Sequence, residues 1–544
     1  MLSEILSTAK GLSTQGWTWA LNEHPGHLMA VATFFFLMIW RISRFTIIPR
    51  YYPDDPKELP YWIPILGHGV AFFSNSNALL SRAKKHFNNV QDPYGLTIAG
   101  SLTYVITKPP DVAEAYRNTT TLSFNEFVQA IMRGCGCSES CVQAMYNDLP
   151  KEKEGFPNPH GKPLGTLARQ MHINQLYPGD NLDFLEKQFL DWIEPRMTMD
   201  RLRERPYATS YAGSPDSKDE VVLPLLQWCS DFFARAGQRA YFGPELEKLD
   251  DGLPQTFIAF DELSWQILYQ YPDFLAGKMK SSRDAIQRVL KQYFQIPQER
   301  RYGDAWFTKA MEDEMRALGI SEDDIAMMLV TIYWGINTNT RKAAFWLLTY
   351  ILHHNPAYLD LIRTESLPAF PFGPFTSPRN INLTHLHENC PTLDAMWNET
   401  IRLSAYSASV RFLTADTVIG NKILRKGNRL MIPYRQLHFD ESIFGTEYPV
   451  TDFVPERFMS KTGRYLTRSD NWRPFGGGST MCPGRHVAKR FVMLFVAMLA
   501  QRFEIVSLSK RIPVADEGKP VLGLMSVVDG EDVLVKVKAR KVEV

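Results

Sequence analysis

Residues 475–485 constrain the fold of this chain more than any other part of its sequence. They have the sequence FGGGSTMCPGR, and an apolar stretch that predicts a helix, 487–499, follows almost directly. A cysteine just before a helix meets unsatisfied amide N–H groups and the positive end of the helix dipole, and both stabilise a thiolate. The glycines let the backbone fold tightly around the sulfur, and Phe475 can lie against a flat apolar partner. Cys482 is therefore a candidate metal ligand.

The neighbours of Cys482 indicate which metal centre it suits. The segment holds no His and no second Cys, which argues against zinc, whereas one thiolate suits a haem because the porphyrin supplies four ligands. Six cysteines in 544 residues are too few for a disulfide framework. Cys135, Cys137 and Cys141 lie close together in sequence, but no second ligand pair follows at a matching spacing. They are expected to be buried or free thiols.

The segment resembles the haem-binding loop of the cytochrome P450 monooxygenases, and earlier parts of the chain agree in order and spacing. Glu399 and Arg402, three residues apart on a predicted helix, resemble the family's Glu-x-x-Arg pair. Arg457 lies in a Pro-Glu-Arg-Phe sequence that resembles the family's partner element. The resemblance covers the chain from about residue 59, and it implies a structural role for these three charged residues.

The resemblance also implies a cofactor and its contacts. The expected cofactor is haem b, with Cys482 as the axial ligand of the iron. Arg411 matches the family position that pairs with a haem propionate, because guanidinium and carboxylate groups form paired hydrogen bonds. The full set of expected cofactor contacts is Arg411, Phe475, Gly478, Cys482, Gly484 and Arg485.

Residues 334–346, WGINTNTRKAAFW, resemble the central helix of one branch of the family. That branch contains cholesterol 7α-hydroxylase, sterol 12α-hydroxylase and prostacyclin synthase. Thr480 agrees with it, because most other members carry a basic residue two positions before the cysteine. The acid–alcohol pair that members usually carry on the central helix is absent here.

Two alignments of the central helix are open. One puts Asn339 in the place of the alcohol and Thr338 in that of the acid, whereas a shift by one residue pairs Asn337 with Thr338. We favour the first. An Asn amide can orient water and hydrogen-bond oxygen, and a Thr hydroxyl can relay protons, so the candidate catalytic residues are Thr338, Asn339 and Thr340. The same polar residues can also merely kink or cap a buried helix.

Two chemistries follow from the resemblance. The leading one is a membrane-bound haem-thiolate monooxygenase that oxidises a sterol, a terpenoid or a related lipophilic metabolite with O2. Its electrons would come from NADPH through a separate cytochrome P450 reductase, because the chain shows no flavin or nicotinamide domain. The alternative is an isomerase or dehydratase that acts on a peroxide or an epoxide without O2 or reductase. By family analogy, the substrate pocket would include Ile336, Ala408, Ser409, Leu524 and Met525.

The front of the chain predicts a membrane anchor. Residues 28–40 are apolar except Thr33, but they make only about 20 Å of helix, so the flanks must help to span a core of about 30 Å. The arginines that follow place the rest of the chain on the cytosolic side. The family resemblance implies that the membrane is that of the endoplasmic reticulum, crossed once. The expected order is a lumenal segment 1–26, an anchor 27–48, a proline-rich linker 49–58 and a catalytic domain 59–544.

Composition and periodicity indicate the fold class. With 60 basic and 59 acidic residues the net charge is +1, so no strong field attracts nucleic acid, and no such partner is expected. Helical patterns dominate, which predicts a mainly α (α+β) cytochrome P450 fold with small sheets, preceded by a transmembrane anchor. The predicted helices are 322–352, 391–403 and 485–503, and the predicted strands are 104–107, 411–419, 429–433 and 533–537, the last preceded by a hairpin turn at Asp529-Gly530.

Overall fold

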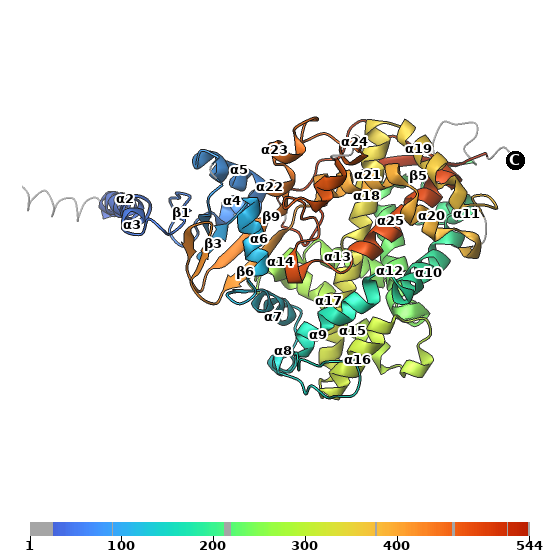
Figure 1. Cartoon of the computed structure of the whole chain (residues 1–544), viewed down its shortest axis with the longest axis horizontal. Helices are drawn as coiled ribbons and strands as arrows, with labels where there is room; N and C mark the ends of the chain where they lie inside the picture. Colours follow the sequence, from blue (N-terminus) through green and yellow to red (C-terminus); the bar gives the residue numbers. More distant parts are fainter. Residues whose placement is uncertain are drawn as a thin grey trace, which may run out of the picture.

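Long helices wrapped around a common core form most of the computed structural model (Figure 1). The structure describes residues 25–541 except 90, 211–218, 376–377, 460–462 and 519. The central members are α12 (Leu225–Leu249), α18 (Thr340–His354) and α25 (Arg485–Arg502). Side chains all round α18 and α25 are buried, as expected of helices enclosed by other helices rather than lying at a surface.

The predicted helix 322–352 is interrupted. The structure has α17 (Glu322–Asn337) and α18, separated by Thr338 and Asn339. Ser321 caps the first helix by accepting a hydrogen bond from the N–H of Asp324. The helices predicted at 391–403 and 485–503 are confirmed as α21 (Pro391–Ser404) and α25.

The other helices surround this core or connect its parts. The α-helices are α2 (Pro25–Ile42), α3 (Ile48–Tyr51), α4 (Gly69–Ser74), α5 (Ser76–His86), α6 (Pro109–Arg117), α7 (Asn125–Gly134), α8 (Glu139–Tyr146), α9 (Leu164–Leu176), α10 (Asp180–Ile193), α11 (Met199–Arg203), α13 (Leu253–Asp261), α14 (Trp265–Leu268), α15 (Gly277–Gln295), α16 (Trp306–Ala317), α19 (Ala357–Ser366), α20 (Leu383–Glu388), α22 (Tyr434–His438), α23 (Glu441–Phe444) and α24 (Glu456–Met459). A π-helix, η1 (Ser43–Ile47), joins α2 to α3, and the 3-10 helices are η2 (Glu194–Arg196), η3 (Gln298–Arg300), η4 (Leu367–Ala369), η5 (Pro378–Asn380), η6 (Gly463–Arg468) and η7 (Gly478–Thr480).

Three small sheets complete the described part of the fold. The largest has the order β1-β2-β3-β9-β6-β4 and lies at the N-terminal end of the body (Figure 1). Its strands are β1 (Lys57–Glu58), β2 (Tyr94–Ile98), β3 (Ser101–Val105), β4 (Leu122–Ser123), β6 (Ala408–Leu413) and β9 (Arg429–Pro433). The others are β10 (Phe503–Ser507), β11 (Leu534–Ala539) and β5 (Glu220–Pro224), and the pair β7 (Thr417–Ile419) and β8 (Lys422–Leu424).

Two strand predictions need correction. The stretch 411–419 was expected to form one strand, but the chain turns after Leu413 and enters a different sheet at Thr417, because Gly427 N–H donates to the Leu413 carbonyl and closes the first strand. Asp529-Gly530 does form a turn, with Gly530 at a φ of +84°. It does not join two paired strands, since β11 pairs with β10 and β5.

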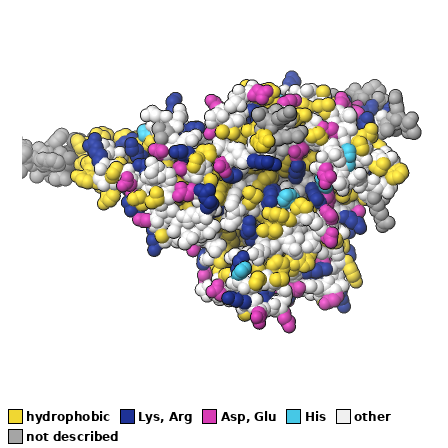
Figure 2. Space-filling view, in the orientation of Figure 1, with side chains coloured by type: hydrophobic (Ala, Val, Ile, Leu, Met, Phe, Trp, Pro, Cys, Tyr) yellow, Lys and Arg dark blue, Asp and Glu magenta, His cyan; other side chains and the backbone are white. Residues whose placement is uncertain are grey.

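The N-terminal helix is attached to the body by specific contacts. Residues 29–51 form a helical stretch of 23 residues, long and apolar enough to cross a membrane and with none of it buried. Figure 2 shows hydrophobic side chains gathered along it. Arg44 forms an ion pair with Glu58 at 2.9 Å, and the Arg41 guanidinium donates to the Tyr61 carbonyl oxygen. The predicted linker 49–58 is helical up to Tyr51, and its last two residues form β1, which pairs with β2.

Other predictions concern the cysteines and the first residues. Cys135, Cys137 and Cys141 are buried and free, as expected. Among the described residues, no group of three or more His, Cys, Asp or Glu side chains is arranged to hold a metal ion. The predicted lumenal segment 1–26 lies almost entirely outside the described residues.

Candidate functional site

The loop before α25 holds Cys482 in a tight turn. The amide N–H of Cys482 donates to the carbonyl oxygen of Phe475 at 2.8 Å, which closes the loop on itself. Gly478 has a φ of +58°, and a Cβ there would lie 2.7 Å from the carbonyl oxygen of Tyr116. Only glycine fits this position without strain. Gly478 therefore shapes the loop around Cys482, whereas its expected contact with the cofactor stays a prediction.

The Cys482 thiol faces a cavity rather than the protein interior. The residue is exposed although it lies deep in the protein, so the surface that it exposes belongs to the cavity. Burial raises the pKa of the thiol, while the N–H groups of Gly484 and Arg485 and the Arg485 charge lower it. Arg485 itself points away from the cavity, donating to the Cys482 carbonyl and to the Tyr177 hydroxyl. A positive centre at the sulfur would stabilise the thiolate further.

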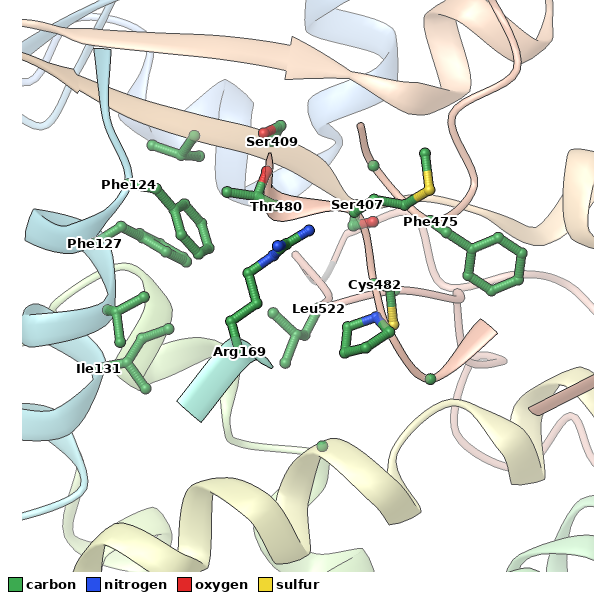
Figure 3. A pocket seen from close by; sticks show the side chains of 18 of the residues that line it. Phe124, Phe127, Ile131, Arg169, Ser407, Ser409, Phe475, Thr480, Cys482 and Leu522 are labelled. Carbon is green, nitrogen blue, oxygen red and sulfur yellow. The ribbon is translucent and has the colours of Figure 1, made fainter. Parts of the chain in front are cut away.

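The cavity is large and mostly apolar, with a volume of about 940 Å³. The cysteine loop forms one wall, and side chains of α7, α9, α17 and β6 form the others (Figure 3). Most predicted contacts line it: Ile336, Asn339, Thr340, Ala408, Ser409, Arg411, Phe475, Cys482, Gly484 and Leu524. Four do not, namely Thr338, Gly478, Arg485 and Met525. Met525 is buried in the core, where its carbonyl oxygen accepts from Trp346 Nε1 at 2.8 Å.

Asn339 faces the cavity at the interruption of the central helix. Its Oδ1 accepts a hydrogen bond from the N–H of Leu524 at 3.0 Å, which fixes the amide. The approach is so close that a Cβ at Gly523 would collide with the Asn339 side chain. Thr340, which also lines the cavity, has its hydroxyl 3.4 Å from the Ile336 carbonyl oxygen. Both side chains are therefore placed by the break between α17 and α18.

Thr338 turns the other way, towards a buried ion cluster. Its hydroxyl lies 2.9 Å from Oδ1 of Asp261, the last residue of α13. Asp261 pairs with Arg341 at 2.5 Å and with Lys342 at 3.0 Å. Burial alone would raise the pKa of Asp261, but the charges of Lys342 and Arg341 outweigh it and lower the pKa to about 2. Asn337 is also buried and away from the cavity, and neither its Oδ1 nor its Nδ2 has a partner among the described residues.

Arg411 is a buried cation without an acidic partner. Its guanidinium donates to the Ser409 hydroxyl, the Val410 carbonyl and the Thr480 hydroxyl, and it lies 4.8 Å from the ring of Phe124. Among the described residues no carboxylate is within ion-pair distance of it. Burial lowers the pKa of the guanidinium.

Arg169, which sequence reasoning missed, is a second cation without an acidic partner among the described residues, and it is partly buried. It extends from α9 into the cavity beside the cysteine loop (Figure 3). Its Nε is buried and has no hydrogen-bond partner in the described part of the chain. No motif in the sequence marks it, because one arginine on an amphipathic helix is usually a solvated surface residue.

These residues fit a flat metal-centred group that carries carboxylates. The thiol would supply one ligand to the metal, and Phe475 and the apolar walls suit a planar ring system. Arg411 and Arg169 are cations that need acidic partners, and the side chains lining the cavity supply none. The donor set therefore agrees with haem and not with a zinc or calcium site.

Glu399, Arg402 and Arg457 form a closed network away from the cavity. Arg402 binds both carboxylate oxygens of Glu399 at 2.8 Å, and Arg457 pairs with the same carboxylate at 3.3 Å. The remaining guanidinium N–H groups donate to backbone carbonyls, including those of His438 and Pro449. All three side chains are buried, so their contacts agree with the predicted structural role.

Comparison with known proteins decides the family. The family model described as Cytochrome P450 matches residues 216–528, more than half of the chain. The chain belongs to the cytochrome P450 family. It is similar to the cytochrome P450 monooxygenase poxD of Penicillium oxalicum, with 27% identity over 86% of this chain and 90% of the relative. It is also similar to the cytochrome P450 monooxygenase nodJ of Hypoxylon pulicicidum, with 23% identity over 83% of this chain and 84% of the relative.

A more distant similarity reaches the sterol-oxidising P450s. The 5-beta-cholestane-3-alpha,7-alpha-diol 12-alpha-hydroxylase of Sus scrofa shares 24% identity over 62% of this chain and 68% of its own length. These P450 relatives confirm the family assignment made from the sequence, and the helical body with small sheets confirms the fold class. As a P450 monooxygenase, the protein is an enzyme that uses a haem-thiolate cofactor, O2, a redox partner and a small-molecule substrate.

Proposed function

We propose that this P450 holds haem b with Cys482 as the axial iron ligand and inserts one oxygen atom of O2 into a lipophilic substrate. The observation that carries this proposal is the thiol facing a large apolar cavity, which is also lined by Asn339 and by two cations that have no acidic partner among the described residues. Bound haem supplies the oxidising chemistry, because a thiolate ligand favours cleavage of the O–O bond. Arg411 and Arg169 would bind its propionates by charge-assisted hydrogen bonds.

The side chains of the central helix would manage protons and water. The Leu524 N–H occupies Oδ1 of Asn339, so the Nδ2 group is the part of the amide left to face the cavity. It would hold a water or an oxygen atom in place by donating to it. Thr340 would pass a proton through its hydroxyl. Thr338 would act indirectly, because its hydroxyl is engaged by Asp261, and would fix the course of the backbone at the interruption.

The cavity walls support a lipophilic substrate. Phe124, Phe127, Ile131 and Leu522 line it, and Figure 3 shows the first three on the far side of Arg169 from Cys482. A pocket of this kind binds mainly by burying apolar surface, with a few polar groups that orient the ligand. We infer a sterol, a terpenoid or a related metabolite, in line with the 12-alpha-hydroxylase among the relatives.

Membrane attachment would bring enzyme and substrate together. The stretch Met29–Tyr51 would serve as a single anchor in the endoplasmic reticulum membrane, with the catalytic body from residue 59 on the cytosolic side. Trp62, Ile63 and Ile65 are exposed apolar side chains just after it and would touch the lipid surface. Electrons would come from NADPH–cytochrome P450 reductase, since monooxygenases of the family draw electrons from a redox partner.

Products of the microsomal enzyme test this function. Microsomes with the full chain receive a sterol and terpenoid extract, with and without NADPH and the reductase. A gain of one oxygen that requires NADPH supports the monooxygenase. Products of unchanged mass formed equally without NADPH would establish the isomerase or dehydratase instead, a reading favoured by one observation, the lack of any Asp or Glu among the described residues that line the cavity.

The ligand assignment has a matched control. Cys482→Ala should abolish the thiolate signature of the ferrous–carbon monoxide spectrum and all turnover. Cys390→Ala removes a buried thiol that lies outside the cavity, and it should keep both. A Cys482→Ala protein that retains the signature would refute the assignment.

A further inference from the structure

The charges around the cavity do not balance. Its lining contains four cationic side chains and, within the described part of the chain, no acidic one. The cations are Lys162, Arg169, Arg411 and Arg429. Haem b brings two propionates, which would neutralise Arg411 and Arg169 beside the cysteine loop. Two partly buried cations, Lys162 and Arg429, then remain in the lining without an acidic partner among the described residues.

Arg429 lies on a different face of the sheet from Arg411. In the antiparallel pair β6–β9, Phe412 is opposite Arg429 and Arg411 is opposite Leu430. Residues directly opposite share a face, and neighbours along a strand point to opposite faces. Arg411 reaches the Thr480 hydroxyl in the cysteine loop, whereas Arg429 lies 5.1 Å from the Phe412 ring. Arg429 is therefore not placed to share the cofactor contacts of Arg411.

The Arg429 guanidinium has a hydrogen-bond partner in the described part of the chain, but no acidic one. It donates to Gln270 Oε1 at 3.3 Å, and no carboxylate pairs with it among the residues that the structure describes. Gln270 follows α14 with a φ of +51°, a left-handed conformation that is unfavourable for a residue with a side chain. Strained backbone of this kind persists where the surroundings hold it, commonly at binding sites. Burial also lowers the pKa of Arg429.

An apolar stripe leads from Arg429 towards the thiol. Val410 and Met431 lie opposite each other on the face that Arg429 shares with Phe412, and Ala408 continues it opposite Pro433. All of them except Pro433 line the cavity. The four steps along the strand from Arg429 to Pro433 span about 13 Å. The next residue towards the chain start, Ser407, lines the same cavity as Cys482.

We propose that Arg429 binds the carboxylate of a lipophilic acid whose hydrocarbon body lies along this stripe. This deepens the proposed function and rests on it, because it names the acidic group of the oxidised substrate. A guanidinium can bind a carboxylate through two parallel hydrogen bonds, and Gln270 holds it in position. The end of the substrate remote from the acid then reaches the cofactor. Oxidation is expected at that remote end.

The binding preference of the wild-type enzyme is the first test. The haem-loaded full chain is titrated at pH 7.4 with hexadecanoic acid and with hexadecan-1-ol, and then with abietic acid and its alcohol abietinol. Binding is read from the haem absorption change and from equilibrium dialysis. We expect the acid of at least one pair to bind about tenfold to hundredfold more tightly, the range of a charge-assisted pair. Equal affinities within both pairs would overturn the proposal.

Variants locate the preference at one residue. R429M should bind acid and alcohol alike, and R429K should keep part of the preference. K426M changes an exposed lysine three residues earlier that does not line the cavity, and should behave as wild type. R429M should also keep its haem. Loss of haem in R429M would assign Arg429 to the cofactor, and an unchanged acid preference would place the acid elsewhere; either result overturns the proposal.

The acid site and the proposed oxygen insertion can be refuted independently, because the binding titrations need neither NADPH nor reductase. If neutral and acidic ligands bind alike while NADPH-dependent oxygen insertion is intact, only the acid site is refuted. If the acid preference holds and R429M removes it, while no lipid gains oxygen, the proposed oxygen insertion is refuted and the acid site stands.

Discussion

Two groups of arginines in this P450 have opposite surroundings. Around Glu399, the guanidinium groups of Arg402 and Arg457 share one carboxylate and several backbone carbonyls, so their hydrogen bonds close within the protein. Around the cavity, Arg411 and Arg169 have no acidic partner among the described residues. The first group needs nothing further, and the second is complete only when a ligand brings negative charge.

This difference indicates which arginines stabilise the fold and which bind a ligand. A buried charge is stable only when it is paired and hydrogen-bonded, because it has lost its contact with water. Where the chain itself supplies the partner, removing one member should destabilise the fold. Where the partner is absent, removing the cation should weaken ligand binding and leave the empty fold intact or more stable. The predictions below test this distinction.

The largest effect is expected in the closed network. Glu399→Gln leaves two buried guanidinium groups without a carboxylate, and should lower the free energy of unfolding by about 3–5 kcal/mol. The midpoint of urea unfolding, followed by fluorescence, measures it. Glu388→Gln, at an exposed position on α20, should change the midpoint little. A wild-type midpoint for Glu399→Gln would show that this network is not structural.

Arg411→Met should affect the cofactor more than the fold. Loss of a charge-assisted pair with a propionate should weaken haem binding by about 1.5–3 kcal/mol, roughly tenfold to hundredfold. The apoprotein should be as stable as wild type or more stable, since an unpaired buried cation is gone. Haem titration and urea unfolding of the apoprotein measure the two effects, with Arg468→Met at an exposed position as the control. A strongly destabilised apoprotein would place Arg411 with the structural arginines.

Part of the free energy of unfolding should depend on the ionisation of Asp261 and be lost in acid. Its pKa is lowered to about 2 by Lys342 and Arg341, so its ionised form stabilises the fold above about pH 4. As the pH falls from about 4 to about 2 the carboxylate becomes protonated, and about 2 kcal/mol should be lost. Urea midpoints measured between pH 5 and pH 2 should show this loss in wild type and in the exposed control Asp148→Asn. A parallel curve for Asp261→Asn would contradict the assignment.

The smallest effect is expected at Asn339, where one amide is held by the chain and also faces the cavity. Asn339→Ala removes one neutral hydrogen-bonding group, so product formed per NADPH should fall about threefold to tenfold while substrate affinity stays nearly unchanged. Product yield and NADPH consumption, measured together, show it. Asn389→Ala, at an exposed helix end, is the control. Full coupling in Asn339→Ala would favour the alignment that pairs Asn337 with Thr338.

Local sequence signals predicted the regular helices and the cysteine loop well. α21 and α25 begin at the predicted residues because the start signals, a proline and a glycine-rich turn, are local. The family resemblance is also carried by short motifs, and Glu399, Arg402 and Arg457 meet in space as their order implied.

Features that depend on distant partners could not be predicted in this way. The break in the central helix coincides with contacts from Asn339 to Leu524 and from Thr338 to Asp261, which lie far away in the chain. Likewise, Arg169 and Arg429 become notable only when the cavity shows that neither has an acidic partner among the described residues. A single sequence contains these residues but not the spatial relation that gives them a role.

The contacts between the N-terminal helix and the body bear on how the catalytic body is oriented relative to the membrane. Arg44 with Glu58, and Arg41 and Trp40 with Tyr61, fasten the helix to the first residues of the body at several points. If the helix is the membrane anchor, as proposed, these contacts make the catalytic body tilt together with the helix. A flexible linker would instead let the body rotate relative to the membrane. The direction from which a lipid enters the enzyme would then be set by the few residues that make these contacts.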